Sequence, residues 1–86
     1  MSEQRSFTPT EIIEGTLMPE RVSLEQDEFH ILSKATATAI KSSDIDALET
    51  LVSRGLRLCS RIPTNQALLL TGIIDVAQAG IEKSTV

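Results

Sequence analysis

Hydrophobic positions in residues 43–81 recur at alternating steps of three and four, the spacing of helices that pack side by side. We predict two helices here. The first would start at Ser43, which forms a capping pattern with Asp46, and Pro63 would interrupt it, because proline lacks an amide hydrogen. Thr64 is expected to cap the second helix. The positions predicted to form a seam, either in the core or across a dimer interface, are Ile45, Leu48, Val52, Cys59, Leu70, Ile73, Ile74, Ala77 and Ile81.

The second of these helices carries two apolar stripes. One includes Leu70, Ile74 and Ala77, and the other includes Leu69 and Val76. A single neighbouring helix covers only about a third of a helix surface. Two stripes therefore predict two neighbours, and we expect this last helix to be the most buried one.

Residues 8–41 predict one short helix and one long helix. Thr8 and Glu11 form a capping box around a proline at the first helical position, and Gly15 is expected to end this helix in a left-handed conformation. A second capping box, which begins at Ser23, starts a helix that should run to about Lys41. Its predicted buried face is thin and rich in small residues: Leu24, Phe29, Ile31 or Leu32, Ala35, Ala39 and Ile40.

These patterns predict an all-α fold, either a small three-helix bundle or a helical hairpin, with a short N-terminal helical turn. Residues 1–22 would form an acidic leader with a short helix and an extended connector, and residues 23–83 the helical domain. The chain has 86 residues, two Phe and no Trp or Tyr, so its core must be aliphatic and small. We therefore expect dimerisation to complete the core.

The charge distribution separates an acidic end from a basic middle. The net charge is −4, yet residues 1–30 carry seven acids against two arginines, whereas residues 31–62 carry five basic residues against three acids. A moderately acidic chain argues against non-specific binding to nucleic acid or to an anionic membrane. The first residues lack the basic segment followed by an apolar segment that is typical of a signal peptide, and the longest apolar run of the chain is Ala67–Leu70. We expect a soluble, cytoplasmic protein with no membrane association.

No pattern of catalytic residues is evident. His30 is the only histidine, Cys59 is the only cysteine, and the four glycines are isolated from one another, so no phosphate-binding loop is present. Cys59 is expected to be a small buried hydrophobe. We predict a protein that is not an enzyme and that has no metal or cofactor.

The leading hypothesis is a small helical module that binds another protein as a regulator, adaptor, inhibitor or secretion-type chaperone, and that forms a homodimer. Arg54, Arg57 and Arg61 align on one helical face. This row has two interpretations: a patch for an acidic partner or a phosphate backbone, or a solvated face that pairs with the acidic N-terminal third. The candidate partner-binding residues are Ile12, Ile13, Leu17, Met18, Arg54, Arg57 and Arg61.

Residues 20–59 resemble a ribbon-helix-helix DNA-binding module. The segment Arg21–Leu24 stands before an amphipathic helix, and Lys41–Ile45 joins that helix to a second one, which ends with Ser53–Leu58. The resemblance implies a strand that pairs across a dimer and inserts Arg21 and Ser23 into the major groove. The sequence departs from the family in lacking a glycine in the turn between the helices and in having a short strand. A repressor or antitoxin of this kind is the alternative prediction.

Overall fold

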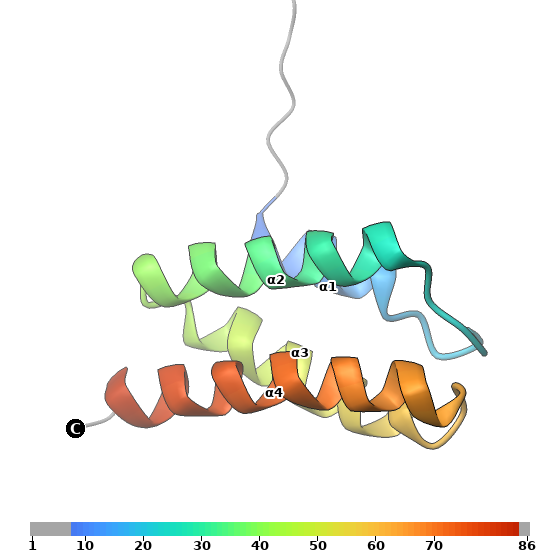
Figure 1. The fold of residues 1–86 in the computed structure, drawn as a ribbon. Coiled ribbons are helices and arrows are strands. Elements are labelled where there is room, and N and C mark those ends of the chain that lie inside the picture. Colours follow the sequence, from blue (N-terminus) through green and yellow to red (C-terminus); the bar gives the residue numbers. More distant parts are fainter. Residues whose placement is uncertain (1–7, 85–86) are drawn as a thin grey trace, which may run out of the picture.

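The structure, a computed structural model, describes residues 8–84, which form four α-helices and no strand (Figure 1). The prediction of an all-helical fold is confirmed. α2 and α4 run in the same direction, and α3 runs the opposite way beside α4. α1 packs on α2 and α3. The helices are α1 (Pro9–Thr16), α2 (Gln26–Lys41), α3 (Ile45–Cys59) and α4 (Thr64–Ser84).

The helix starts follow local capping chemistry, although three of them differ from the prediction: α2 and α3 have other caps, and Thr64, which was expected to cap α4, is its first residue. At α1 the Thr8 hydroxyl accepts from the Glu11 amide at 3.2 Å, and the Glu11 carboxylate accepts from the Thr8 amide at 3.1 Å, so the predicted capping box is present. The cap of α2 is Glu25 rather than Ser23. The cap of α3 is Asp44, whose carboxylate accepts from the Ala47 amide at 3.2 Å.

Two predicted backbone roles are also wrong. Ser43 precedes the cap of α3 and has a φ of 56°, so it forms the left-handed turn between α2 and α3. A serine hydroxyl in that turn cannot cap the helix as Asp44 does. Gly15 lies inside α1 without a positive φ, and α1 continues to Thr16.

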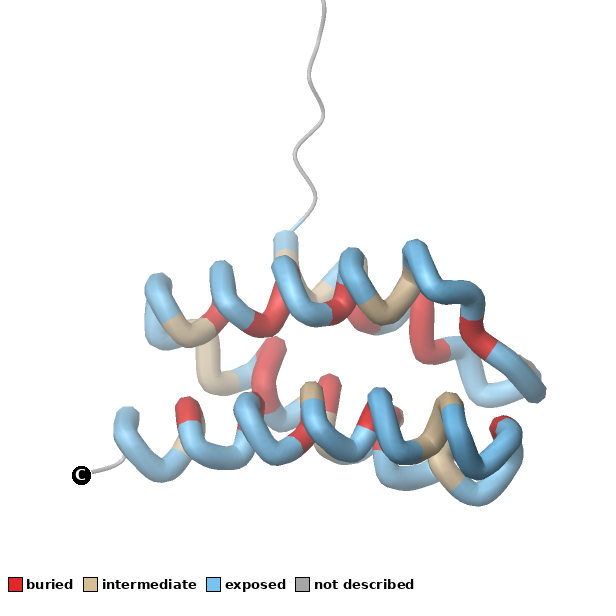
Figure 2. The backbone as a smooth tube through the Cα atoms, viewed as in Figure 1, coloured by how far each residue is buried: buried red, intermediate tan, exposed pale blue. Residues whose placement is uncertain are grey.

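The buried positions, most of them aliphatic, lie where the layer of α1 and α2 faces the layer of α3 and α4 (Figure 2). α2 and α3 each contact all three other helices, whereas α4 contacts only α2 and α3. The two neighbours of α4 agree with its two apolar stripes. The expectation that it is the most buried helix is wrong, because 4 of its 21 residues are buried against 5 of the 15 in α3. The buried hydrophobic residues are Ile13, Leu17, Leu24, Leu32, Ala35, Ala39, Ala47, Leu48, Leu51, Leu58, Ile62, Leu70, Ile74 and Ala77.

Glycines set the distance between helices at two contacts. A Cβ on Gly55 would lie 2.8 Å from Ile74 Cδ1, and a Cβ on Gly80 would lie 2.8 Å from Ile40 Cγ1. Both distances are too short for real side-chain contacts, so a larger residue at either position would force Ile74 or Ile40 to move.

Residues 8–22 belong to the same folded unit as the remaining helices, because α1 packs on α2 and α3 and the side chains of Ile13 and Leu17 lie in the common core. The predicted acidic leader is thus in part an integral layer of the fold. The part of the predicted leader that covers residues 1–7 lies outside the described residues.

Candidate protein-interaction surfaces

An apolar groove runs along the surface between α2 and α4. Its volume is about 720 Å³. Leu69 and Val76 contribute its most exposed aliphatic side chains, which are 57% and 52% accessible to solvent. Lys41 is the one charged residue among those that line it. The groove residues are Ser33, Thr36, Ala37, Thr38, Ile40, Lys41, Leu69, Gly72, Ile73 and Val76.

The groove exists because α2 presents small residues to α4 over most of its length. Thr36 is buried, and its hydroxyl donates a hydrogen bond back to the Leu32 carbonyl at 2.7 Å. Ala37, at the next position, has a side chain too short to fill the groove between α2 and α4. Near the end of α2 the larger side chain of Ile40 closes the contact, where it lies against Gly80. The second apolar stripe of α4 therefore faces α2 but is incompletely covered.

A second hollow, which we call the basic hollow, lies where the connector after α1 crosses the C-terminal half of α3. Its volume is about 360 Å³. Arg61 donates a hydrogen bond from Nη1 to the Pro19 carbonyl and so holds the connector against the end of α3. Among the described residues, no carboxylate forms an ion pair with any arginine of the hollow. The basic hollow is formed mainly by Leu17, Met18, Pro19, Arg54, Arg57 and Arg61.

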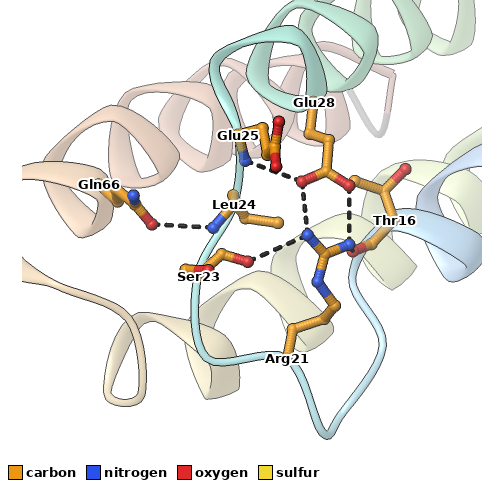
Figure 3. A network of polar contacts seen from close by, with 7 residues as sticks. All are labelled: Thr16, Arg21, Ser23, Leu24, Glu25, Glu28 and Gln66. Atoms are coloured by element: carbon orange, nitrogen blue, oxygen red, sulfur yellow. Dashed lines mark hydrogen bonds and ion pairs between the residues drawn. The ribbon is translucent and has the colours of Figure 1, made fainter.

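A polar network fixes the connector to α2 and α4 (Figure 3). Arg21 binds both oxygens of the Glu28 carboxylate, with Nη1 2.7 Å from Oε2, and it also donates to the Thr16 carbonyl at 3.3 Å and the Ser23 carbonyl at 3.1 Å. The Leu24 amide donates to Gln66 Oε1 at 2.8 Å. Together these bonds join the connector to the first turns of two helices.

The same network sets the ionisation of Glu28. Hydrogen bonds from Arg21 lower the pKa of the Glu28 carboxyl, burial opposes them, and the Glu25 amide lowers the pKa further. The Arg21 side chain thus faces Glu28 and the chain's own carbonyl groups. The geometry that DNA reading requires, an outward Arg21 on a strand, is not present in residues 8–84 of the single chain.

The predicted partner-binding residues fall into two groups. Ile13 and Leu17 are buried in the core, so the fold leaves them unavailable as primary contacts, and Ile12 is half-buried. Met18 is 41% exposed. It lies in the basic hollow with the three arginines, which the sequence placed about forty positions away.

The predicted seam residues lie between helices of one chain. Leu48, Leu70, Ile74 and Ala77 are buried, and Ile45, Val52, Cys59, Ile73 and Ile81 are partly buried against them. The Sγ of Cys59 lies 3.9 Å from the Ala67 carbonyl oxygen and 3.8 Å from Thr71 Oγ1, between α3 and α4. The part of the chain that the structure describes contains no group of three or more acidic, histidine or cysteine side chains able to hold a metal ion.

Sequence reasoning missed the α2 wall of the groove. The signal was the run Ala35–Ala39, whose side chains are small.

No family model, curated protein or solved structure matches this chain. None of the helices within residues 8–84 has both the length and the hydropathy needed to cross a membrane.

Proposed function

We propose that this protein is a non-enzymatic helical module that binds other proteins and that forms a homodimer through the groove between α2 and α4. The observation that carries the proposal is the open groove itself, in which Leu69 and Val76 expose more than half of their surfaces beside a row of small α2 residues. Apolar surface of this kind is stabilised by covering it with another helix.

The spacing of the groove residues on α4 suits a second copy of the same helix. In an antiparallel pair of α4 helices centred between Gly72 and Ile73, Leu69 of one chain lies opposite Val76 of the other. A two-fold axis makes both halves of such an interface identical. Each chain would then supply to its partner the aliphatic side chains that its own α2 lacks.

Gly72 supports a close approach at this centre. A Cβ at Gly72 would meet no atom within 4 Å, so nothing inside the chain requires glycine there. Glycine in the interior of a helix is less favourable than alanine by about 1 kcal/mol. A second helix that crosses closely at Gly72 would explain why this position is a glycine.

The test is the solution mass, measured by light scattering on a sizing column over a range of protein concentrations. The wild-type protein is expected to elute with twice the chain mass, and Leu69→Asp is expected to be a monomer. Leu68→Asp is the matched control, because Leu68 is the neighbouring leucine, is 69% exposed and does not line the groove. It should leave the dimer intact.

A second variant separates loss of the interface from loss of the fold. Gly72→Glu fills the centre of the groove with a charged side chain while replacing glycine with a better helix former, so the monomer should stay folded. A wild-type protein that is monomeric at every concentration would overturn the dimer. A Leu69→Asp protein that remains dimeric would exclude this groove as the interface.

A further inference from the structure

We propose that the basic hollow binds an acidic segment of a partner protein, one that presents carboxylates together with an aliphatic side chain. The inference rests on the proposed function as a protein-binding module, but it uses a different surface from the α2/α4 groove. It assigns a ligand chemistry to a site built from Leu17, Met18, Pro19, Arg54, Arg57 and Arg61.

The three arginines form a row of positive charge that has no ion-pair partner among residues 8–84. Arg54, Arg57 and Arg61 are three and four positions apart, so their side chains emerge on one side of α3 and the turn after it. Neither Arg54 nor Arg57 forms an ion pair with a carboxylate of the described residues. A guanidinium group binds a carboxylate through two parallel hydrogen bonds, which makes this row suited to acidic side chains.

The apolar part of the hollow makes it more than a charged surface. Met18 is held beside the arginines, because Arg61 binds the carbonyl of the neighbouring Pro19. The largely buried side chain of Leu17 also lines the hollow and adds to its apolar surface. Methionine adapts to varied aliphatic shapes, so an apolar ligand side chain can lie against Met18 while nearby carboxylates meet the arginines.

The surroundings favour a short acidic peptide over nucleic acid. Directly beside the basic hollow, and sharing Arg54 with it, lies a smaller hollow that contains Glu14, Asp46 and Glu49. A phosphate backbone that continued from the arginines along α3 would meet these three carboxylates. A peptide can end its acidic stretch at Arg54, and the net charge of −4 also disfavours nucleic acid.

The experiment measures fluorescence anisotropy with synthetic probes of defined chemistry. The probes are a short labelled peptide of glutamate and leucine, a second with serine in place of leucine, a third with lysine in place of glutamate, and a labelled oligothymidine. Only the glutamate–leucine peptide is expected to bind well. Arg54→Glu/Arg57→Glu should weaken its binding at least tenfold, roughly the loss expected when two exposed attractions become repulsions.

A matched control keeps the overall charge equal. Lys34→Glu/Lys83→Glu changes the net charge by the same amount at exposed positions outside both surfaces, so it should bind like the wild type. Met18→Ser should remove the preference for the leucine peptide over the serine peptide, an effect that charge alone would not produce. Far-UV circular dichroism establishes that each variant is folded.

Three outcomes would overturn the inference: no binding of the glutamate–leucine peptide, tighter binding of oligothymidine, or an equal loss in the two charge-reversal variants. The titrations are repeated with Leu69→Asp. Because the basic hollow and the α2/α4 groove share no lining residue, the Leu69→Asp variant should still bind the peptide. If the wild-type protein is a dimer but binds no peptide, only the peptide-binding inference is refuted. If it is a monomer that binds the peptide, only the proposed dimer is refuted.

Discussion

Replacing Arg21 with alanine is expected to destabilise the fold. The Arg21 guanidinium makes two hydrogen bonds to the Glu28 carboxylate and one each to the carbonyls of Thr16 and Ser23. Alanine removes all four bonds and leaves a partly buried carboxylate without its positive partner. The connector would then be attached to α2 and α4 chiefly through Leu24 and Gln66.

The size of the loss lies between two limits. Removing one partner of a hydrogen bond to a charged group costs about 1.5–3 kcal/mol, whereas exposed ion pairs contribute about 0.2–1 kcal/mol. The Arg21 and Glu28 side chains are 27% and 24% exposed, so water screens the pair in part. We expect Arg21→Ala to lower the free energy of unfolding by about 1.5 kcal/mol and the melting temperature by roughly 6–12 °C.

The assay is thermal and urea unfolding followed by circular dichroism, with Lys34→Ala as the control, because Lys34 is exposed and forms no ion pair with another described residue. A double-mutant cycle with Glu28→Gln should give a coupling of about 1 kcal/mol. If Arg21→Ala unfolds within about 0.5 kcal/mol of the wild type, the network does not hold the connector. An Arg21 that points outward to read DNA would give that result.

The pH dependence of stability provides a second view of the same pair. The pKa of Glu28 is lower in the folded chain than its ordinary value of 4.5, so the folded state binds fewer protons. This contribution to stability is therefore complete above pH 4.5 and is lost as the pH falls through the lowered pKa. Glu28→Gln should remove that part of the acid destabilisation while lowering stability at neutral pH. An acid limb that is unchanged in this variant would contradict the assignment.

Three further predictions concern packing and are checked by urea unfolding at concentrations low enough to exclude association. Gly72→Ala should raise the free energy of unfolding by up to about 1 kcal/mol, since its Cβ meets no atom, and a decrease would contradict the open geometry. Gly55→Ala should give no such gain, because its Cβ would press on Ile74, and a gain equal to that of Gly72→Ala would refute the close approach. Leu70→Asp should abolish folding, because it places a carboxylate in the core, and a stable, monodisperse monomer would refute the assignment of Leu70 to the core.

Local patterns in the sequence were sufficient to predict which segments are helical, but not where three of the four helices of residues 8–84 begin. The capping box of Thr8 and the proline turn after α3 depend on residues within a few positions of one another, so the pattern and the structure agree there. The start of α2 was misplaced because it depends on side-chain contacts outside the capping pattern, one of which comes from a residue 42 positions away. Arg21 binds the Ser23 carbonyl and Glu28, and Gln66 binds the Leu24 amide, so residues 21–24 are held outside the helix.

The sequence identified many residues of the two surfaces, but it did not show which of them lie together in the fold. The sequence indicated Met18 and the arginine row separately. The packing of α1 on α3 and the hydrogen bond from Arg61 to the Pro19 carbonyl bring them into one hollow. The sequence also showed two stripes on the last helix. Whether the second stripe would be covered depended on side-chain volume in α2, where Thr36 and Ala37 are too small to fill the space beside Leu69.

The glycines of α3 and α4 give an independent reason to regard the α2/α4 groove as an unfinished contact. At Gly55 and Gly80 a neighbouring side chain lies 2.8 Å from the position that a Cβ would occupy, so packing inside the chain explains both. Gly72 has no such neighbour, although it lies in the middle of a 21-residue helix. It is also flanked on its own stripe by two exposed aliphatic side chains, Leu69 and Val76. A helix-weakening residue and solvated apolar surface are each unfavourable alone. A second helix that crosses α4 at Gly72 and covers Leu69 and Val76 would explain both the glycine and the exposed apolar surface.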